Sequence, residues 1–249
     1  MTLSLGALCT DFYVNQKLAL KMDLPTARET VLDMFDRIRK ELPRMDWFRR
    51  YEGELALESS EHESQYSWIA LRQTSVRSGW VNPETLEEAY KLHRLILSVA
   101  PYFLSISPLD VDYLELVFGF DLEAATNRNE VVFDALLGGS ALASMVDTER
   151  ESVLDAQPFL GFSLSDDCRL QAFVEVKTRT ASGEVATGRY SEEPISVYLT
   201  TRRYGPLASI DDFTASFGTL AGYSERLAEE RLIPQVVMPI RDAILSRPG

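Results

Sequence analysis

The stretch from Tyr66 to Phe120 constrains the fold of this chain most, because it carries a strand, a helix and a strand in sharply patterned succession. The helix is signalled at Asn82-Pro83-Glu84, where a capping residue precedes a proline and an acid that suit a first turn. Pro101 is expected to end it, because a residue before proline avoids helical backbone angles. Its apolar stripe repeats at helical spacing and consists of Leu86, Tyr90, His93, Leu97 and Ala100.

Strand patterns lie on both sides of this helix. Tyr66 to Arg77 is rich in β-branched and aromatic residues, and Asp112 to Phe120 has apolar residues on both of its faces. A strand that is apolar on both faces is usually a central one, covered on both sides. We expect the core to include Leu86, Tyr90, Ile96, Leu97, Leu114, Leu116 and Phe118.

The order of elements predicts an α+β fold with antiparallel sheets and packed helices. A strand within Leu3 to Leu20, a helix after Pro25 and a strand from Trp47 to Glu58 precede the central stretch. This first half therefore has the β-α-β-β-α-β order of ferredoxin-like folds. The chain from Asp112 onward has a βαβββα-type order, which raises the hypothesis of an internal duplication.

We expect two units, residues 1–122 and 123–249, and one continuous domain stays open as an alternative. Ala181 to Glu193 is expected to form a mobile loop, because it contains Ser182-Gly183 and Gly188 and lacks periodic apolar residues. The final helical region is expected to break at Pro234.

The net charge of the chain argues against some classes of function. The chain has 25 Lys and Arg against 38 Asp and Glu, a net charge of −13. A broad nucleic-acid surface needs a concentrated basic face, and anionic membranes are disfavoured for the same reason. Cys9 and Cys168 are the only cysteines, too few for a disulfide framework, and no signal peptide is recognisable at the start. These observations predict a cytoplasmic protein of bacterial type that contacts neither nucleic acid nor membrane.

The motif search predicts no cofactor and no metal. The chain lacks a phosphate-binding loop, a dinucleotide fingerprint, an H-E-x-x-H pair and a C-x-x-C pair. His62 lies between Glu61 and Glu63, but neighbouring side chains in a turn point apart, so a solvated turn is the favoured interpretation.

Arg72, Arg77 and His93 are the candidate ligand-binding residues. Arginines on strands of an acidic protein can form a pocket for an anion or a carboxylate, and a histidine in a cleft can act as a general base. The alternative is structural: the arginines pair with strand glutamates such as Glu52, Glu115 and Glu175, and His93 is a core residue.

We expect a non-enzymatic adaptor or structural protein that works through a protein partner or self-association. Trp47 and Trp80 lie near the ends of predicted strands, where aromatic anchors serve interfaces. The alternative is a small-anion or carboxylate binder, or an enzyme, that uses the strand arginines and His93 in a cleft between the halves. Convergence of Arg72, Arg77 and His93 on one cavity would favour this alternative.

Overall fold

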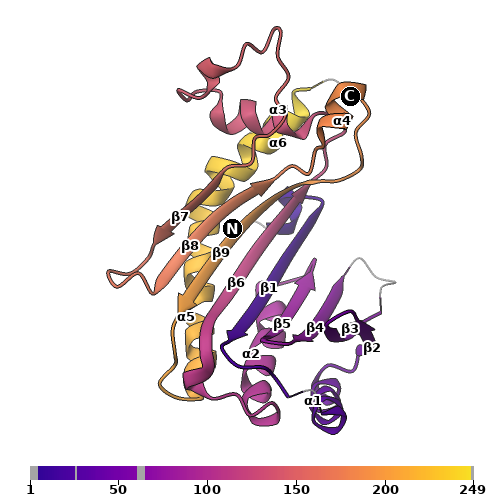
Figure 1. Ribbon diagram of the computed structural model, residues 1–249, viewed down its shortest axis with the longest axis vertical. Coiled ribbons are helices and arrows are strands. Elements are labelled where there is room, and N and C mark those ends of the chain that lie inside the picture. The colour runs from indigo at the N-terminus through magenta and orange to yellow at the C-terminus, as the bar shows by residue number, and fades with distance from the viewer. Residues whose placement is uncertain (1–4, 26, 61–64, 248–249) are drawn as a thin grey trace.

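The computed structural model describes residues 5–25, 27–60 and 65–247. The fold is α+β, and the described residues contain nine strands that form one antiparallel sheet with helices packed on it (Figure 1). The strands are β1 (Asp11–Leu20), β2 (Met45–Tyr51), β3 (Glu54–Ser59), β4 (Tyr66–Arg72), β5 (Ser75–Val81), β6 (Val111–Leu122), β7 (Phe159–Ser163), β8 (Leu170–Lys177) and β9 (Ile195–Tyr204). The helices are α1 (Arg28–Glu41), α2 (Leu86–Phe103), α3 (Arg128–Val132), α4 (Ser182–Thr187), α5 (Asp211–Leu227) and α6 (Met238–Leu245).

The sheet joins the two halves of the chain through its two middle strands. Its order is β2-β3-β4-β5-β1-β6-β9-β8-β7, and β1 pairs with both β5 and β6. Each half begins with one of these middle strands, continues through a helix into a run of antiparallel strands, and ends in a long helix. In each half the last strand of the run, β5 or β9, pairs with the first strand of that half. The division at residue 122 stays a prediction, and the sheet runs across it without a break.

The ferredoxin-like order of the first half is not confirmed. Between α1 and α2 the chain forms four strands, where the sequence predicted two. The predicted strand from Trp47 to Glu58 is divided by a turn at Glu52 and Gly53, where Gly53 has a positive φ of 70°. The one predicted from Tyr66 to Arg77 is divided by a turn at Gln73 and Thr74.

Helices cover one face of the sheet. The long helix α5 packs against β6 and β9, behind the sheet in Figure 1, and α2 packs against β5 and β1. The rings of Tyr90 on α2 and Phe217 on α5 meet at 5.4 Å between centroids, so the two helices share one core. Of the seven predicted core residues, six are buried, and Leu86 is partly exposed at the start of α2.

Helix boundaries correct two sequence predictions. The helix α2 starts at Leu86 and is capped by Thr85, whose hydroxyl accepts from the Glu88 N–H at 3.3 Å. Asn82 instead joins β5 to β1, since its side-chain oxygen accepts from the Phe12 N–H at 2.9 Å. At the other end of the chain, Pro234 does not break the helix. It lies in a π-helical segment, Ala228–Val237, that links α5 to α6.

The stretch predicted as a mobile loop contains α4 and is held by a buried arginine. Arg128, at the start of α3, has no exposed surface and donates to the carbonyls of Thr178 at 2.8 Å and Ser191 at 2.6 Å. It also forms an ion pair with Glu184 of α4 at 3.3 Å. A buried guanidinium with paired donors fixes both ends of this stretch.

Candidate binding surface on the uncovered sheet face

The face of the sheet opposite the helices is the candidate functional site. Strand side chains alternate between two faces, so the registers give the residues that share this one. Nearly all are partly exposed, in contrast to the buried residues between them. The larger side chains on this face are Tyr13, Lys17, Trp47, Arg49, Tyr51, Glu54, Glu58, Trp68, Arg72, Arg77, Tyr113, Glu115, Asp121, Phe159, Phe173, Glu175, Lys177, Tyr198, Arg202 and Tyr204.

Three aromatic rings on this face lie over glycines of the neighbouring strand. Trp68 is directly opposite Gly79, Tyr13 is opposite Gly119, and Phe173 is opposite Gly161. A Cβ added at Gly119 would come within 2.1 Å of the Tyr13 ring, and one at Gly161 within 2.8 Å of the Phe173 ring. Aromatic residues stabilise sheet glycines in this way, by covering the backbone that lacks a side chain. The rings are therefore fixed in place by the sheet.

Cationic side chains lie over rings of this face, among them Trp68 and Phe173. The Arg202 guanidinium is 4.4 Å from the Tyr113 ring centroid and 5.3 Å from that of Phe173. Farther along the sheet, Arg77 lies 5.5 Å from Trp68, and Arg49 lies 4.5 Å from the ring of Trp47. Cation–π contacts of this kind restrict the positions of the guanidinium groups.

Cations of this face are paired with carboxylates on the same strand or on a neighbouring one. Arg202 donates to Glu115 at 2.6 Å, Arg49 lies 3.8 Å from Glu58, and Lys177 lies 3.2 Å from Glu175. The side chains named for this face include six cations and five acids, a balance of +1. The whole chain has a net charge of −13. The uncovered face is therefore a nearly neutral area on a strongly acidic protein.

A polar cluster lies where β1, β6 and β9 meet. Asp121 accepts from the hydroxyls of Tyr13 at 3.3 Å and Ser196 at 2.5 Å, and Arg179 donates to Ser196 at 2.7 Å. Burial raises the pKa of Asp121, and the hydrogen bonds and Arg179 oppose that rise. Burial also raises the pKa of Tyr13, so its phenol stays protonated and donates at physiological pH.

Arg72 and Arg77, which the sequence predicted as ligand-binding residues, lie together on this face. They line a hollow of about 300 Å³ together with Lys17. Both arginines pair with Glu54 of β3, Arg77 at 3.7 Å. Asn15 also lines the hollow, and its side-chain oxygen is a buried acceptor with no hydrogen-bond partner among the described residues. The structure thus brings the two predicted arginines together in a cavity. It also pairs both of them with a strand glutamate, which is the kind of contact that the structural alternative predicts.

His93 is not part of this hollow. It is fully buried on the helix-covered side, where its Nδ1 lies 2.8 Å from the Ser78 hydroxyl, which in turn donates to Gln16 at 3.0 Å. Burial lowers the pKa of His93 to about 3 and outweighs the raising effect of the Val14 backbone. A neutral imidazole without solvent access is suited to packing and is a poor general base at neutral pH.

The two predicted partner-binding tryptophans lie on opposite sides of the sheet. Trp47 lies on the uncovered face at the edge strand β2, and its side chain is 43% exposed. Trp80 lies on the other side, since its cross-strand partner is the buried Val14, and it lines a second cavity of about 580 Å³. Only Trp47 therefore belongs to the candidate surface.

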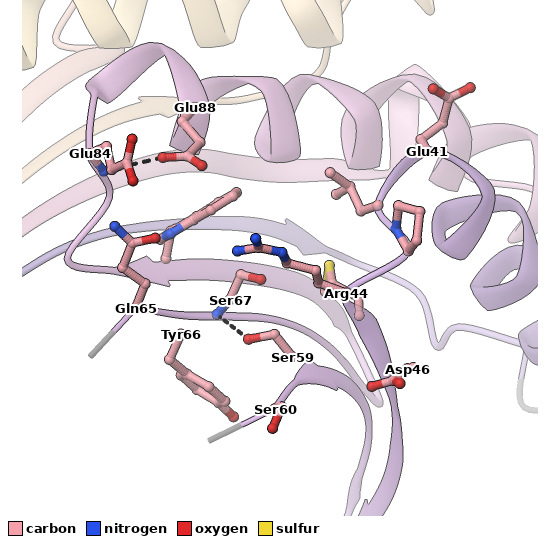
Figure 2. A pocket seen from close by; sticks show the side chains of 14 residues that line it. Glu41, Arg44, Asp46, Ser59, Ser60, Gln65, Tyr66, Ser67, Glu84 and Glu88 are labelled. Atoms are coloured by element: carbon pink, nitrogen blue, oxygen red, sulfur yellow. Dashed lines mark hydrogen bonds between the residues drawn. The ribbon is translucent and has the colours of Figure 1, made fainter. Parts of the chain in front are cut away.

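The cavity beside Trp80 lies between the C-terminal end of α1 and the start of α2. Figure 2 shows the Arg44 side chain extending into it, with Glu84 and Glu88 on one wall and the hydrogen-bonded pair Ser59 and Ser67 on another. Its lining has four acids against this one arginine, so it is unsuited to an anion. The E-H-E sequence around His62 lies outside the described residues.

Within the described ranges, no group of three or more His, Cys, Asp or Glu side chains could hold a metal ion. In the same part of the chain, no helix has the length and apolar character that crossing a membrane requires.

Comparisons with known proteins identify no family. No protein-family model matches the chain, and no curated protein matches it. Among solved structures, the di-domain ARO/CYC protein BexL from the BE-7585A biosynthetic pathway aligns with 95% of this chain and 99% of its own. The two chains are 9% identical and the TM-score is 0.21, so this likeness carries no inference about fold or function.

Sequence reasoning missed most of the uncovered face. Tyr13, Lys17 and Tyr113 are among its central side chains, and none of them was predicted as a site residue. Their signal is present in the sequence as aromatic and charged residues that alternate with core residues along long strands. Finding it requires the register between strands that are distant in the sequence, which periodicity alone does not give.

Proposed function

We propose that this protein is a non-enzymatic adaptor or structural protein that binds a protein partner through the uncovered face of its sheet. One observation carries the proposal: rings that lie over glycines, together with guanidinium groups that lie over rings, form an ordered, nearly neutral surface. Tyr, Trp and Arg are the residues that contribute most binding energy at protein interfaces. Rings that are already fixed lose little conformational entropy when a partner covers them.

The charge pattern favours a protein over a nucleic acid. Phosphate binding requires cations that are free to replace counterions, and Arg202, Arg49 and Lys177 each have a carboxylate partner on this face. A partner that is itself acidic would meet the least repulsion here, because the rest of the molecule carries nearly all of the net charge. We also propose that the protein works in the cytoplasm, a reducing compartment in which both of its cysteines would remain free.

The test is capture of partners from the native source with two matched double variants. Glu115→Gln with Arg202→Met removes the central stacked ion pair of the uncovered face and leaves no unpaired buried charge. Glu87→Gln with Arg94→Met removes a pair on α2 that has the same 2.6 Å separation and also stacks on rings, at 5.7 Å from Tyr90. We expect the first variant to lose the captured partner by tenfold or more and the second to retain it, as quantified by mass spectrometry.

Equal retention by both variants, or equal loss, would contradict the proposal, provided that circular dichroism shows both to be folded. Substrate turnover that survives loss of all partners would favour an enzyme instead.

The hollow lined by Lys17, Arg72 and Arg77 supports a second candidate function, the binding of a small carboxylate. Its cations would hold the carboxylate, and the unpaired Asn15 oxygen would accept from a donor on the same ligand. We expect lactate, which has a hydroxyl, to bind more tightly than acetate in isothermal titration calorimetry. Lys17→Met should weaken the binding of both acids, because it removes a cation that would hold the carboxylate. Equal or absent binding of the two acids would remove this candidate.

A further inference from the structure

The edge strand β7 has main-chain groups available for another strand. The even-numbered residues of this segment make its hydrogen bonds to β8. The Val176 N–H donates to the Pro158 carbonyl at 3.0 Å, and the Leu164 N–H donates to the Leu170 carbonyl at 2.7 Å. Because antiparallel pairing alternates, the N–H and C=O groups of Phe159, Gly161 and Ser163 point away from the sheet. Strand addition uses groups of this kind.

The side chains of β7 leave this edge unprotected, unlike those of the opposite edge. The sequence of β7, Phe-Leu-Gly-Phe-Ser, has no charge, and Phe159 and Leu160 are 64% and 62% exposed on its two faces. The other edge strand, β2, carries Asp46, Arg49 and Arg50. Charged residues on edge strands normally prevent pairing between molecules, so β7 lacks a protection that β2 has.

We propose that β7 pairs antiparallel with β7 of a second copy of this chain, about a two-fold axis at Gly161. In this register Gly161 lies opposite its own equivalent, and Phe159 lies opposite Ser163. Leu160 lies opposite Phe162, so the exposed apolar side chain of each copy is covered by an apolar side chain of the other. This self-complementarity singles out a second copy over an unrelated peptide, and no like charges meet within the strand.

The pairing would extend the uncovered face across both molecules. Phe159 stacks on Phe173 with centroids 5.8 Å apart and an interplanar angle of 27°, and Phe173 covers Gly161. The two-fold axis would place both of these ring stacks beside each other on a single continuous sheet. A five-residue strand buries little area, so the association is expected to be weak, in the micromolar range or above.

Electrostatics gives the association a distinctive salt dependence. Each copy has a net charge of −13, and β7 itself has none. Added salt screens repulsion between the copies and does not weaken apolar or main-chain contacts. Dimerisation should therefore strengthen from low to physiological ionic strength.

The first test is sedimentation velocity of the whole chain over a concentration series at two salt concentrations. We expect a monomer–dimer equilibrium that Leu160→Lys weakens by about tenfold or more, because the lysine places two like charges near the axis. Leu109→Lys is the matched control: it changes a leucine that is 74% exposed outside the sheet, and should leave the equilibrium unchanged.

The second test fixes the register with cysteines in a Cys168→Ser background, which removes an exposed thiol. Residues 160 and 162 of opposing copies form a pair without main-chain hydrogen bonds, in which side chains are closest. Mixed Leu160→Cys and Phe162→Cys proteins should form a disulfide-linked heterodimer faster than either protein forms a homodimer. A monomer at all concentrations, an equilibrium insensitive to Leu160→Lys, or preferential homodimer cross-linking would overturn the proposal.

Discussion

The two faces of the sheet are stabilised in different ways. On the covered face, side chains such as Val14, Leu116 and Phe118 are buried against α2 and α5, and removal of apolar surface from water dominates. On the uncovered face, aromatic rings lie over glycines, and cations pair with carboxylates so that their charges cancel. The comparison indicates that the first face carries the stability of the fold, whereas the second is ordered without being covered.

Polar contacts on the covered face also join the strands to the helices. In the first half the Ser78 hydroxyl of β5 lies 2.8 Å from His93 of α2. In the second half Thr201 of β9 and Ser224 of α5 are also 2.8 Å apart. Both contacts join the last strand of a half to its long helix and use buried groups that need a partner.

The largest expected effect separates the two faces at neighbouring positions of β6. Leu116 is fully buried, and Val117 beside it points to the uncovered face. Leu116→Ala should lower the free energy of unfolding by about 2–5 kcal/mol through lost burial and cavity formation. Val117→Ala should cost about 1 kcal/mol or less. Equal urea midpoints for the two variants would show that the faces are not distinguished by burial.

A second prediction tests whether the rings on the uncovered face occupy space that only a glycine opposite them leaves open. Gly119→Ala places a methyl group within 2.1 Å of the Tyr13 ring, so we expect a loss of about 1–3 kcal/mol. The ring is the cause, so Tyr13→Ala should largely relieve the penalty in a double-mutant cycle measured by urea unfolding. Additive effects of the two substitutions would mean that the ring does not lie over this glycine.

The covered face should also show a pH dependence that comes from His93. The pKa of His93 is lowered to about 3 in the folded protein, and an unfolded histidine has a pKa of about 6.5. The unfolded chain therefore binds the proton first, and stability is lost as the pH falls from about 6.5 towards 3. The slope is at most about 1.4 kcal/mol per pH unit.

His93→Gln cannot titrate, so it should remove this contribution to the slope whatever its effect on stability at pH 7. Urea unfolding of both proteins at a series of pH values measures the difference. An unchanged slope would show that His93 is not held neutral by burial.

The smallest expected effect concerns the ion pair at the centre of the uncovered face. Replacing both partners, Glu115→Gln with Arg202→Met, should change the unfolding free energy by about 1 kcal/mol or less, because partly exposed pairs contribute little and no unpaired charge remains. Thermal unfolding at low and high salt measures it. A loss comparable to that of Leu116→Ala would make this face structural and would weaken the binding proposal.

Local patterns in the sequence were sufficient to predict much of the covered face. The spacing of Tyr90, Leu97 and Ala100 gave the buried side of α2, and the apolar residues of both faces identified β6 as central. Alternation and helical spacing are local properties, so they can be recognised in a single sequence.

The remaining features depend on contacts between distant segments. The division of two predicted strands into four follows from short turns, of which only Gly53 carries a recognisable signal. Arg128 is fully buried because segments 50 and 63 residues away supply its acceptors, and nothing near it in the sequence shows this. Arg72 and Arg77 line one hollow, and Lys17 joins them there only through the pairing of β1 with β5.

Hydroxyl-radical footprinting with mass spectrometry tests the central claim most directly. The protein is oxidised alone and together with its captured partner, and the modification of individual aromatic side chains is compared. We predict that the partner protects Tyr113, Tyr198 and Tyr204 on the uncovered face, while Tyr102, an exposed residue near the end of α2, stays equally reactive. Protection of Tyr102 with unchanged reactivity on the sheet would contradict the assignment of the uncovered face as the binding surface.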